Sequence, residues 1–154
     1  MISYIHASND EEYYQASLLF QEYAKWLNID LTFQNFEDEL RSLKEMYSGK
    51  KAILILGYDN LNCVACVGVR QIDEETAELK RMYVKPMYQR KGIGQSLLNQ
   101  SLEFAKKAKY NKIRLDTLEH MTPAMNLYLT NGFYKIDAYY FNPEPTAIYF
   151  EKLV

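Results

Sequence analysis

The pattern of apolar and polar positions predicts a strand and two helices in the first fifty residues. Ile2 to His6 forms a short strand, and Ser8-Asn-Asp-Glu11 is a capping box, an arrangement that starts a helix. Beyond it, apolar residues recur at helical spacing: Ala16, Leu19, Phe20, Tyr23 and Leu27. A second helix begins near Asn35, ends at Gly49, and repeats apolar residues at Phe36, Leu40, Leu43 and Tyr47.

From residue 52 onward the pattern becomes one that is typical of strands. Three β-rich runs, separated by short polar turns, extend over Ala52 to Tyr58, Cys63 to Ile72 and Thr76 to Val84. Because short turns reverse the chain, we expect the three strands to be antiparallel neighbours. A long helix follows, and one of its faces carries Ile93, Leu97, Leu98, Ser101, Phe104, Ala105 and Ala108.

The last part of the chain predicts three strands and one helix. Lys112 to Leu118 is a strand, and Thr122 is the expected N-cap of a short helix that Asn131-Gly132 ends. Two strands follow, at Phe133 to Phe141 and Thr146 to Lys152. The order β-α-α-β-β-β-α-β-α-β-β indicates a single α/β (α+β) domain over residues 1–154, with a mixed, mostly antiparallel sheet of six to seven strands flanked by about four helices.

Composition and charge narrow the classes of function. The 154 residues carry 18 Lys and Arg against 20 Asp and Glu, so no global charge favours a nucleic acid or an anionic membrane surface. The longest apolar stretch, Ala52 to Leu56, is too short to span a bilayer, and the acidic residues near the start do not fit a signal peptide. These features predict a cytoplasmic protein that binds neither nucleic acid nor membrane.

The two cysteines, Cys63 and Cys66, have the spacing of a redox or zinc motif. A redox pair of this kind normally opens a helix, whereas these residues lie inside an apolar strand run. A structural zinc ion needs four ligands, and the chain offers one such pair. We therefore expect two buried thiols, with no disulfide framework and no metal.

The segment before the long helix holds the first candidate chemistry. In Pro86-Met-Tyr-Gln-Arg-Lys-Gly-Ile-Gly94, the two glycines leave backbone N–H groups open at a helix N-terminus, which forms an anion site. Gln89, Arg90 and Lys91 add donors and positive charge, which suits a pyrophosphate. The loop lacks the Gly-Lys-Ser/Thr ending of a Walker loop and the third glycine of a dinucleotide fingerprint. A plain tight turn is the alternative interpretation.

Three segments form a specific combination: Glu78-Leu-Lys-Arg-Met-Tyr-Val84, Gln89-Arg-Lys-Gly-Ile-Gly94 and Ala124-Met-Asn-Leu-Tyr-Leu-Thr-Asn-Gly-Phe133. Together they resemble the GNAT superfamily of acyl-CoA-dependent N-acetyltransferases. The resemblance covers the whole chain in element order, and it implies acetyl-CoA as the cosubstrate.

The resemblance also implies where coenzyme A would bind. Its pyrophosphate would lie on the loop, in contact with Gln89, Arg90, Lys91, Gly92, Ile93, Gly94, Gln95 and Ser96. The backbone of Met82, Tyr83 and Val84 would pair with the pantetheine arm like an added strand. At the position seven before the helix tyrosine, where the family often has a cofactor-contacting asparagine, this chain has Met121. Nearby Asn126 should point to a different side of the helix, so the replacement for that contact stays open.

Acetyl transfer from a thioester to an amine needs a base for the ammonium proton and an acid for the leaving thiolate. The resemblance implies Glu78 as the base and Tyr128 as the general acid. The residues themselves leave alternatives, since Glu78 could be a solvated carboxylate paired with Lys80, and Tyr128 could be a core residue. His120, in the loop before the last helix, is a further candidate base, with a surface histidine as the alternative.

The segment that joins the first two helices is rich in aromatic residues, and in this family it walls the acceptor site. Trp26, Phe33 and Gln34 are therefore candidate acceptor contacts, with core packing as the alternative. The predicted function is transfer of acetyl from acetyl-CoA to a primary amine by direct attack in a ternary complex, because neither cysteine suits a covalent intermediate. A non-catalytic acyl-CoA-binding module is the rival, and a nucleotide-binding domain is a more distant one. The acceptor stays open, and the late strands offer an edge for a homodimer.

Overall fold

Seven strands form one mixed sheet in the spatial order β1-β2-β3-β4-β5-β7-β6. The structure is a computed structural model that describes residues 1–32 and 35–154. Neighbouring strands are antiparallel except β4 and β5, which run parallel. The predicted fold class is therefore confirmed. The strands are β1 (Ile2–His6), β2 (Ile53–Asp59), β3 (Asn62–Gln71), β4 (Thr76–Val84), β5 (Lys112–Leu118), β6 (Tyr134–Ile136) and β7 (Ala147–Leu153).

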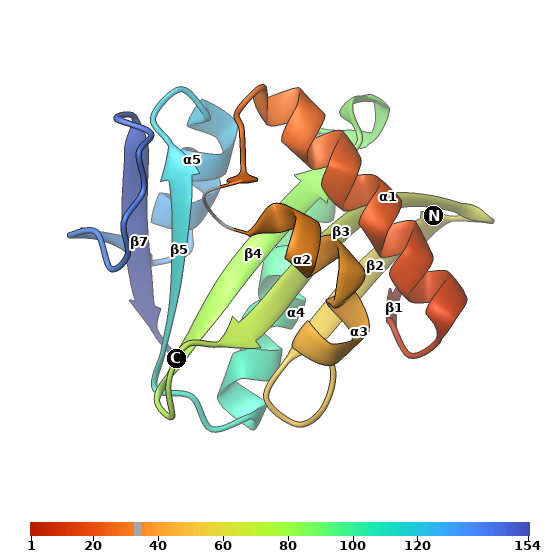
Figure 1. The fold of residues 1–154 in the computed structure, drawn as a ribbon, viewed down its shortest axis with the longest axis horizontal. Helices are drawn as coiled ribbons and strands as arrows, with labels where there is room; N and C mark the ends of the chain where they lie inside the picture. Colours follow the sequence, from red (N-terminus) through yellow and green to blue (C-terminus); the bar gives the residue numbers. More distant parts are fainter. Residues whose placement is uncertain (33–34) are drawn as a thin grey trace.

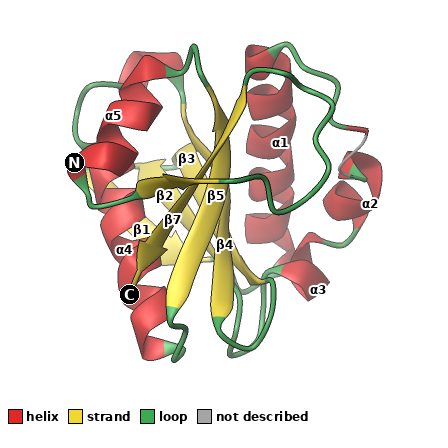
Figure 2. Ribbon diagram, turned by 90° about the vertical axis from the view of Figure 1, so that its left-hand side faces the viewer, coloured by secondary structure: helices red, strands yellow, loops and turns green. Residues whose placement is uncertain are grey.

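Helices cover both faces of the sheet, with α4 and α5 on one face and α1, α2 and α3 on the other (Figures 1 and 2). Each face has its own core, in which Leu97 and Phe150 are buried on the α4 side and Phe20 and Leu54 on the α1 side. Burying one such side chain contributes about 1.5–3 kcal/mol to stability. The helices are α1 (Asp10–Leu27), α2 (Phe36–Arg41), α3 (Leu43–Met46), α4 (Ile93–Lys107) and α5 (Thr122–Thr130).

β4 and β5 pair along only the first part of their length. The ladder joins residues 76–78 to residues 112–114, and none joins the described residues beyond it, where the two strands part (Figure 1). Arg81 has a left-handed φ of +58°, and the β3–β4 register shifts beside it, so β4 carries a bulge. Successive side chains of a regular strand point to opposite faces. The bulge allows both Lys80 and Arg81 to reach the α1 face of the sheet, where they line a cavity.

Two predicted elements differ from those in the structure. The single helix expected from Asn35 to Gly49 is divided into α2 and α3, because Ser42 between them leaves helical geometry. This break allows α2 to direct Glu39 toward the sheet while α3 buries Leu43. The strand expected over residues 133–141 is limited to β6, because the chain beyond Ile136 carries tyrosines whose hydroxyls bond to acids on β4 and β5.

The N-caps of two helices also differ from those expected. Asn9 caps α1 by accepting a hydrogen bond from the backbone N–H of Glu12, and the Glu12 carboxylate accepts one from the N–H of Ser8. The glutamate that reaches back is therefore Glu12 rather than Glu11. At α5, Met121 is the N-cap and Thr122 is already helical, so the predicted Thr122 cap is wrong. These shifts of one residue arise because local side-chain hydrogen bonds compete at adjacent positions.

Candidate functional site

The loop before α4 presents backbone N–H groups at its surface. A 3₁₀ turn, η2 (Pro86–Tyr88), leads into it, Gly92 is the N-cap with a φ of +82°, and α4 begins at Ile93. No described side chain caps this helix, and the N–H of Ser96 donates to the carbonyl of Gly92. The N–H groups before Ser96 therefore lie ahead of the helical hydrogen bonds, at the positive end of the helix dipole. This arrangement suits an anion.

The packing of the protein does not require glycine at position 94. A Cβ atom there would lie 3.6 Å from Cδ2 of Leu127, an ordinary contact distance. Gly92, in contrast, has a left-handed φ that glycine adopts at little cost. Arg90 and Lys91 are exposed beside the two glycines. The small size of Gly94 thus leaves room that the fold itself does not use.

The part of β4 that has separated from β5 lies next to this loop. Met82, Tyr83 and Val84, the predicted pantetheine contacts, are on that part of the strand. Nε2 of Gln89 donates a hydrogen bond of 3.0 Å to the carbonyl oxygen of Val84. The structure therefore brings the predicted pyrophosphate loop into contact with the predicted pantetheine edge.

Two side chains fix α5 against the first turn of α4. Nε2 of Gln95 donates to Oδ1 of Asn131 at 2.8 Å, and Nδ2 of Asn131 donates to Oε1 of Gln95 at 3.0 Å. Asn131 also donates to the carbonyl of Leu127, so it closes the last turn of α5. This clamp sets the position of Tyr128, which lies on the same turn, relative to the glycine loop.

Tyr128 is buried between the helix and the sheet. Its ring packs against the rings of Phe133 and Phe150, with centroids 5.6 Å and 6.2 Å away. Burial raises the pKa of Tyr128 well above its usual range, and Tyr23 and Asp116 act in the same direction. The hydroxyl is therefore protonated at neutral pH, and no hydrogen-bond partner for it occurs among the residues that the structure describes. The ring thus serves packing while the hydroxyl stays available.

A cavity of about 40 Å³ lies on the α1 face of the sheet, where β4 and β5 separate. Its apolar walls come from the end of α1, the segment after it and β5, and include Leu27, Ile29, Leu31 and Leu118. Its polar lining residues are Tyr23, Lys80, Arg81, Asp116, Thr117, Asn142 and Glu144. The cavity therefore adjoins the same gap as the predicted pantetheine edge, from the opposite side of the sheet to α5.

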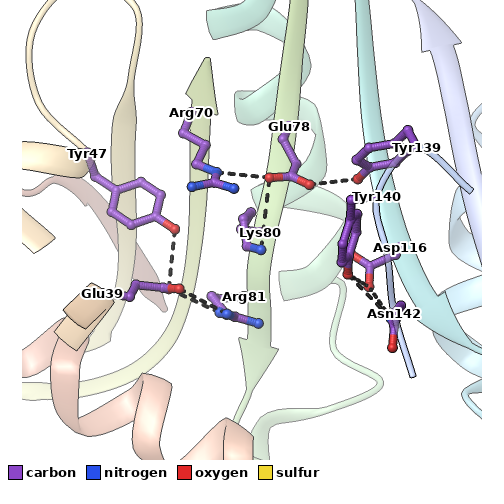
Figure 3. Close-up of polar contacts among 10 residues, drawn as sticks. All are labelled: Glu39, Tyr47, Arg70, Glu78, Lys80, Arg81, Asp116, Tyr139, Tyr140 and Asn142. Carbon is purple, nitrogen blue, oxygen red and sulfur yellow. Dashed lines mark hydrogen bonds and ion pairs between the residues drawn. The ribbon is translucent and has the colours of Figure 1, made fainter. Parts of the chain in front are cut away.

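Glu78 is buried within a group of donors (Figure 3). Its side chain accepts hydrogen bonds from Nε of Arg70 at 2.9 Å and from the hydroxyl of Tyr139 at 2.7 Å, and Nζ of Lys80 lies 3.9 Å away. Burial by itself would raise the pKa of Glu78, but Lys80, Arg70 and the Tyr139 hydroxyl together hold it below the usual value. These surroundings make Glu78 a weaker proton acceptor, and they favour a structural role over the solvated carboxylate that was the alternative.

A second buried ion pair ties α2 to β4. Glu39 accepts two hydrogen bonds from Arg81, at 3.0 Å from Nε and 2.9 Å from Nη2, and both side chains are about 95% buried. The hydroxyl of Tyr47 donates to the same carboxylate at 3.4 Å. A bidentate pair of this kind holds Arg81 in its left-handed conformation at the bulge.

Asp116 of β5 is the carboxylate that the sequence interpretation overlooked. The hydroxyl of Tyr140 donates to its Oδ2 at 2.6 Å, and Nδ2 of Asn142 lies 3.5 Å from the same oxygen (Figure 3). Burial raises the pKa of Asp116 above the usual range, although Tyr140 and Lys80 act against it. Its hydrogen-bond partners, Tyr140 and Asn142, lie 24 and 26 positions further along the chain, so the sequence near Asp116 does not reveal them.

Three of the remaining candidates, Trp26, His120 and Asn126, are described and do not line the cavity. Trp26 is 45% exposed and its ring centroid is 5.7 Å from that of Tyr83, but it is not among the described residues that line the cavity. Phe33 and Gln34 fall outside the described residues. His120 is exposed in the turn before α5, and Asn126 is exposed on α5.

Among the described residues, the cysteines and the charged side chains do not form a metal site. Cys63 and Cys66 are buried free thiols, as predicted. Burial raises the pKa of the Cys63 thiol to about 11 and that of Cys66 well above its usual value. Within residues 1–32 and 35–154, no cluster of three or more His, Cys, Asp and Glu could hold a metal ion. In the same ranges, none of the helices combines the length and the hydropathy needed to cross a membrane.

Known proteins share both the sequence pattern and the fold. Residues 19–133 match the sequence model described as the Acetyltransferase (GNAT) family. An uncharacterized N-acetyltransferase of Schizosaccharomyces pombe is 34% identical over 134 residues, which cover 86% of this chain and 82% of that protein.

Solved structures have the same arrangement of elements. An acetyltransferase from Streptococcus agalactiae has a TM-score of 0.82 at 24% identity, over 99% of this chain and 98% of that one. PaiA N-acetyltransferase from Thermoplasma acidophilum, solved in complex with coenzyme A, has a TM-score of 0.73 at 20% identity, over 100% and 99% of the two chains. At these identities the likeness shows a shared fold.

Proposed function

Because the chain belongs to the Acetyltransferase (GNAT) family, it is an acetyl-CoA-dependent N-acetyltransferase, and we propose that it moves the acetyl group to a primary amine by direct attack in a ternary complex. The observation that carries this proposal is the gap between β4 and β5. The glycine loop adjoins one end of the gap, Tyr128 adjoins it on the α5 face, and the cavity adjoins it on the α1 face. A thioester held in the gap would have its carbonyl carbon accessible to an amine in the cavity.

Direct attack agrees with the protonation and burial of the two cysteine thiols. A covalent route would need a nucleophile that is ionised and accessible. The raised pKa values of Cys63 and Cys66 keep both thiols protonated, and both are buried. Their chemistry therefore supports a mechanism in which donor and acceptor are bound together.

Tyr128 is the proposed proton donor to the departing thiolate. A thiolate is the conjugate base of a group with a pKa of about 8.5, so complete transfer from a tyrosine of raised pKa would be unfavourable by itself. The hydroxyl instead stabilises the growing negative charge on sulfur by a hydrogen bond. Its proton passes to sulfur as a proton from the attacking nitrogen replaces it, so the tyrosine returns to its neutral form.

Free-thiol release from acetyl-CoA, measured with a panel of amines, tests this function. Amine-dependent release is the expected result. Acetyl-CoA binding without release for any amine would contradict catalysis and favour the acyl-CoA-binding module. The homodimer also stays a prediction, for which β6 at the edge of the sheet is the candidate pairing strand.

Replacing Gly94 by valine is expected to abolish the stabilisation of the protein by acetyl-CoA. At a ligand concentration of about 100 Kd, binding should stabilise the parent by about 2.7 kcal/mol. This corresponds to a rise in Tm of about 5–10 °C for a domain of this size. The larger side chain would occupy the space in which the pyrophosphate approaches the backbone, and the shift should disappear in differential scanning fluorimetry.

The matched control is Lys106→Val, which places the same residue on an exposed position at the other end of α4. It should retain the full shift. NAD and ATP should shift the Tm of the parent much less than acetyl-CoA. Normal binding of coenzyme A by Gly94→Val would refute the loop assignment, and equal shifts with all three ligands would favour a general nucleotide-binding domain.

A further inference from the structure

Asp116 presents its carboxylate to the cavity at the point where the strands part. It lies two residues beyond Arg114, the last residue of β5 that pairs with β4. Tyr140 and Asn142 hold its Oδ2 (Figure 3), and the residue is partly exposed. Glu78, with 2% exposure, is not among the described residues that line the cavity. Asp116 is thus the better placed of the two to meet a ligand.

The groups around Asp116 leave it suited to accept a proton. Titratable, charged and polar groups interact with it from α1, β4, α5, β7 and the segment between β6 and β7. They are Tyr23, Glu78, Lys80, Arg81, Tyr128, Tyr139, Tyr140, Asn142 and Tyr149. Glu78 and Arg81 have partners of opposite charge in Arg70 and Glu39. Burial, together with the negative charge of Glu78, raises the pKa of Asp116 above its usual value, although Tyr140, Lys80 and Arg81 act against this rise. A carboxylate of raised pKa is the stronger base.

We propose that Asp116 binds the ammonium group of the acceptor in this cavity and takes the proton that must leave nitrogen before attack. This inference rests on the proposed function. It makes Asp116, rather than Glu78, the catalytic base, and leaves Glu78 to hold Arg70, Lys80 and Tyr139 around the site.

The walls of the cavity also define the class of acceptor. Leu27, Ile29, Leu31 and Leu118 are apolar members of the lining, beside its polar side chains. An apolar substituent beside the amino group would be buried against these side chains, which favours its binding. The acceptor is therefore a primary alkylamine whose first carbon atoms are aliphatic.

The proton balance of the step is complete. An ammonium ion gives one proton to Asp116, and the neutral amine forms the C–N bond with the thioester carbon. The nitrogen then loses a second proton, which replaces the proton that Tyr128 gives to sulfur as the C–S bond breaks. Asp116 releases its proton to solvent. The products are an amide, free coenzyme A and one proton.

The pH dependence of kcat/KM for the amine tests this assignment. The probes are n-alkylamines from ethylamine to hexylamine with acetyl-CoA, and the fastest is used throughout. The parent should give a bell-shaped profile, falling below the pKa of Asp116 and above that of the amine, because ammonium and carboxylate must bind together. Asp116→Asn should lower kcat/KM at neutral pH by about 10²- to 10⁴-fold. Its rate should rise with pH up to the pKa of the amine, since only neutral amine can react.

Glu78→Gln is the matched control, because it removes the other carboxylate. The negative charge of Glu78 raises the pKa of Asp116, so its loss should move the acidic limb to lower pH without removing it. An acidic limb that disappears in Glu78→Gln and persists in Asp116→Asn would overturn the proposal and restore Glu78 as the base.

A weakly basic acceptor provides a second test. Trifluoroethylamine is largely neutral at neutral pH, so it needs no base before attack. With this probe, the ratio of kcat/KM in the parent to kcat/KM in Asp116→Asn should shrink to about tenfold or less. An undiminished difference would show that Asp116 acts on binding or structure, and it would overturn the proton-transfer role.

A measurement without turnover separates this inference from the proposed function. Carboxyl ¹³C resonances of the parent, assigned for Asp116 by comparison with Asp116→Asn, should shift when n-butylammonium is added. If none of the amines is acetylated, the proposed function and the proton-transfer step are both overturned. A perturbed Asp116 resonance would then still support the ammonium site, and an unperturbed one would overturn it.

Discussion

Tyr128→Phe is expected to lower kcat by about 10-fold to 10³-fold while acetyl-CoA binds as in the parent. The substitution keeps the ring that packs against Phe133 and Phe150, and it removes only the hydroxyl. Because no partner of that hydroxyl occurs in the described part of the chain, its removal should change the free energy of unfolding by less than about 1 kcal/mol. Steady-state kinetics and urea unfolding measure the two quantities separately.

Acetyl thioesters of more acidic thiols should reduce this loss of kcat, because such thiolates leave without a donated proton. The loss should also shrink at high pH. If Tyr128→Phe clearly lowers the free energy of unfolding but leaves kcat at the parental value, Tyr128 is a core residue and not the proton donor.

Tyr110→Phe provides the opposite control. Its hydroxyl donates to the carbonyl of Lys51 at 2.6 Å, at the end of the sheet away from the β4–β5 gap. Loss of that hydrogen bond should cost about 0.5–1.5 kcal/mol of stability and leave kcat unchanged. Tyr128→Phe should thus lower kcat with little change in stability, and Tyr110→Phe should lower stability with no change in kcat.

Glu39→Gln is expected to lower the free energy of unfolding by about 3–5 kcal/mol. The substitution removes the charge that compensates Arg81, whose side chain is only 5% exposed. Gln has nearly the same shape as Glu, so the loss reports the uncompensated guanidinium and not a cavity. Urea denaturation, with an unchanged m-value, measures the effect.

The neighbouring residue supplies a matched control on the same helix. Asp38 pairs with Arg41 at 2.7 Å, but both side chains are about 70% exposed. Asp38→Asn should therefore change the free energy of unfolding by no more than about 1 kcal/mol. Equal losses for Asp38→Asn and Glu39→Gln would refute the idea that the buried pair anchors α2 to β4.

Local patterns predicted the elements and the loop because their causes are local. The strands at the centre of the sheet and the long helix α4 follow from periodicity, because side chains alternate between the two faces of a strand and recur about every 3.6 residues on one face of a helix. Gly92 was identifiable because its left-handed φ depends on its own backbone, and the helix end that follows it has unpaired N–H groups wherever it lies in the fold. The cysteines were recognisable as buried because they lie in a continuous apolar run.

The division of the second helix and the shortening of the strand after residue 133 were not predictable in this way. Both depart from the predicted periodicity because a polar side chain in the segment forms a hydrogen bond with a residue far away in the sequence. Glu39 reaches Arg81 over 42 positions, and Tyr139 reaches Glu78 over 61 positions. A window of ten to twenty residues contains one member of each pair, so it contains no signal for the contact.

The sequence by itself determined the order of the elements, the glycine loop and the position of Tyr128 on its helix, since periodicity and backbone requirements act within a few residues. Only the tertiary structure decided which carboxylate meets the cavity. β4 and β5 are separated in sequence by α4 and become neighbours only in the sheet, so their divergence beyond Glu78 is a property of the fold. That divergence exposes Asp116, while donors from β3 and from the segment after β6 enclose Glu78.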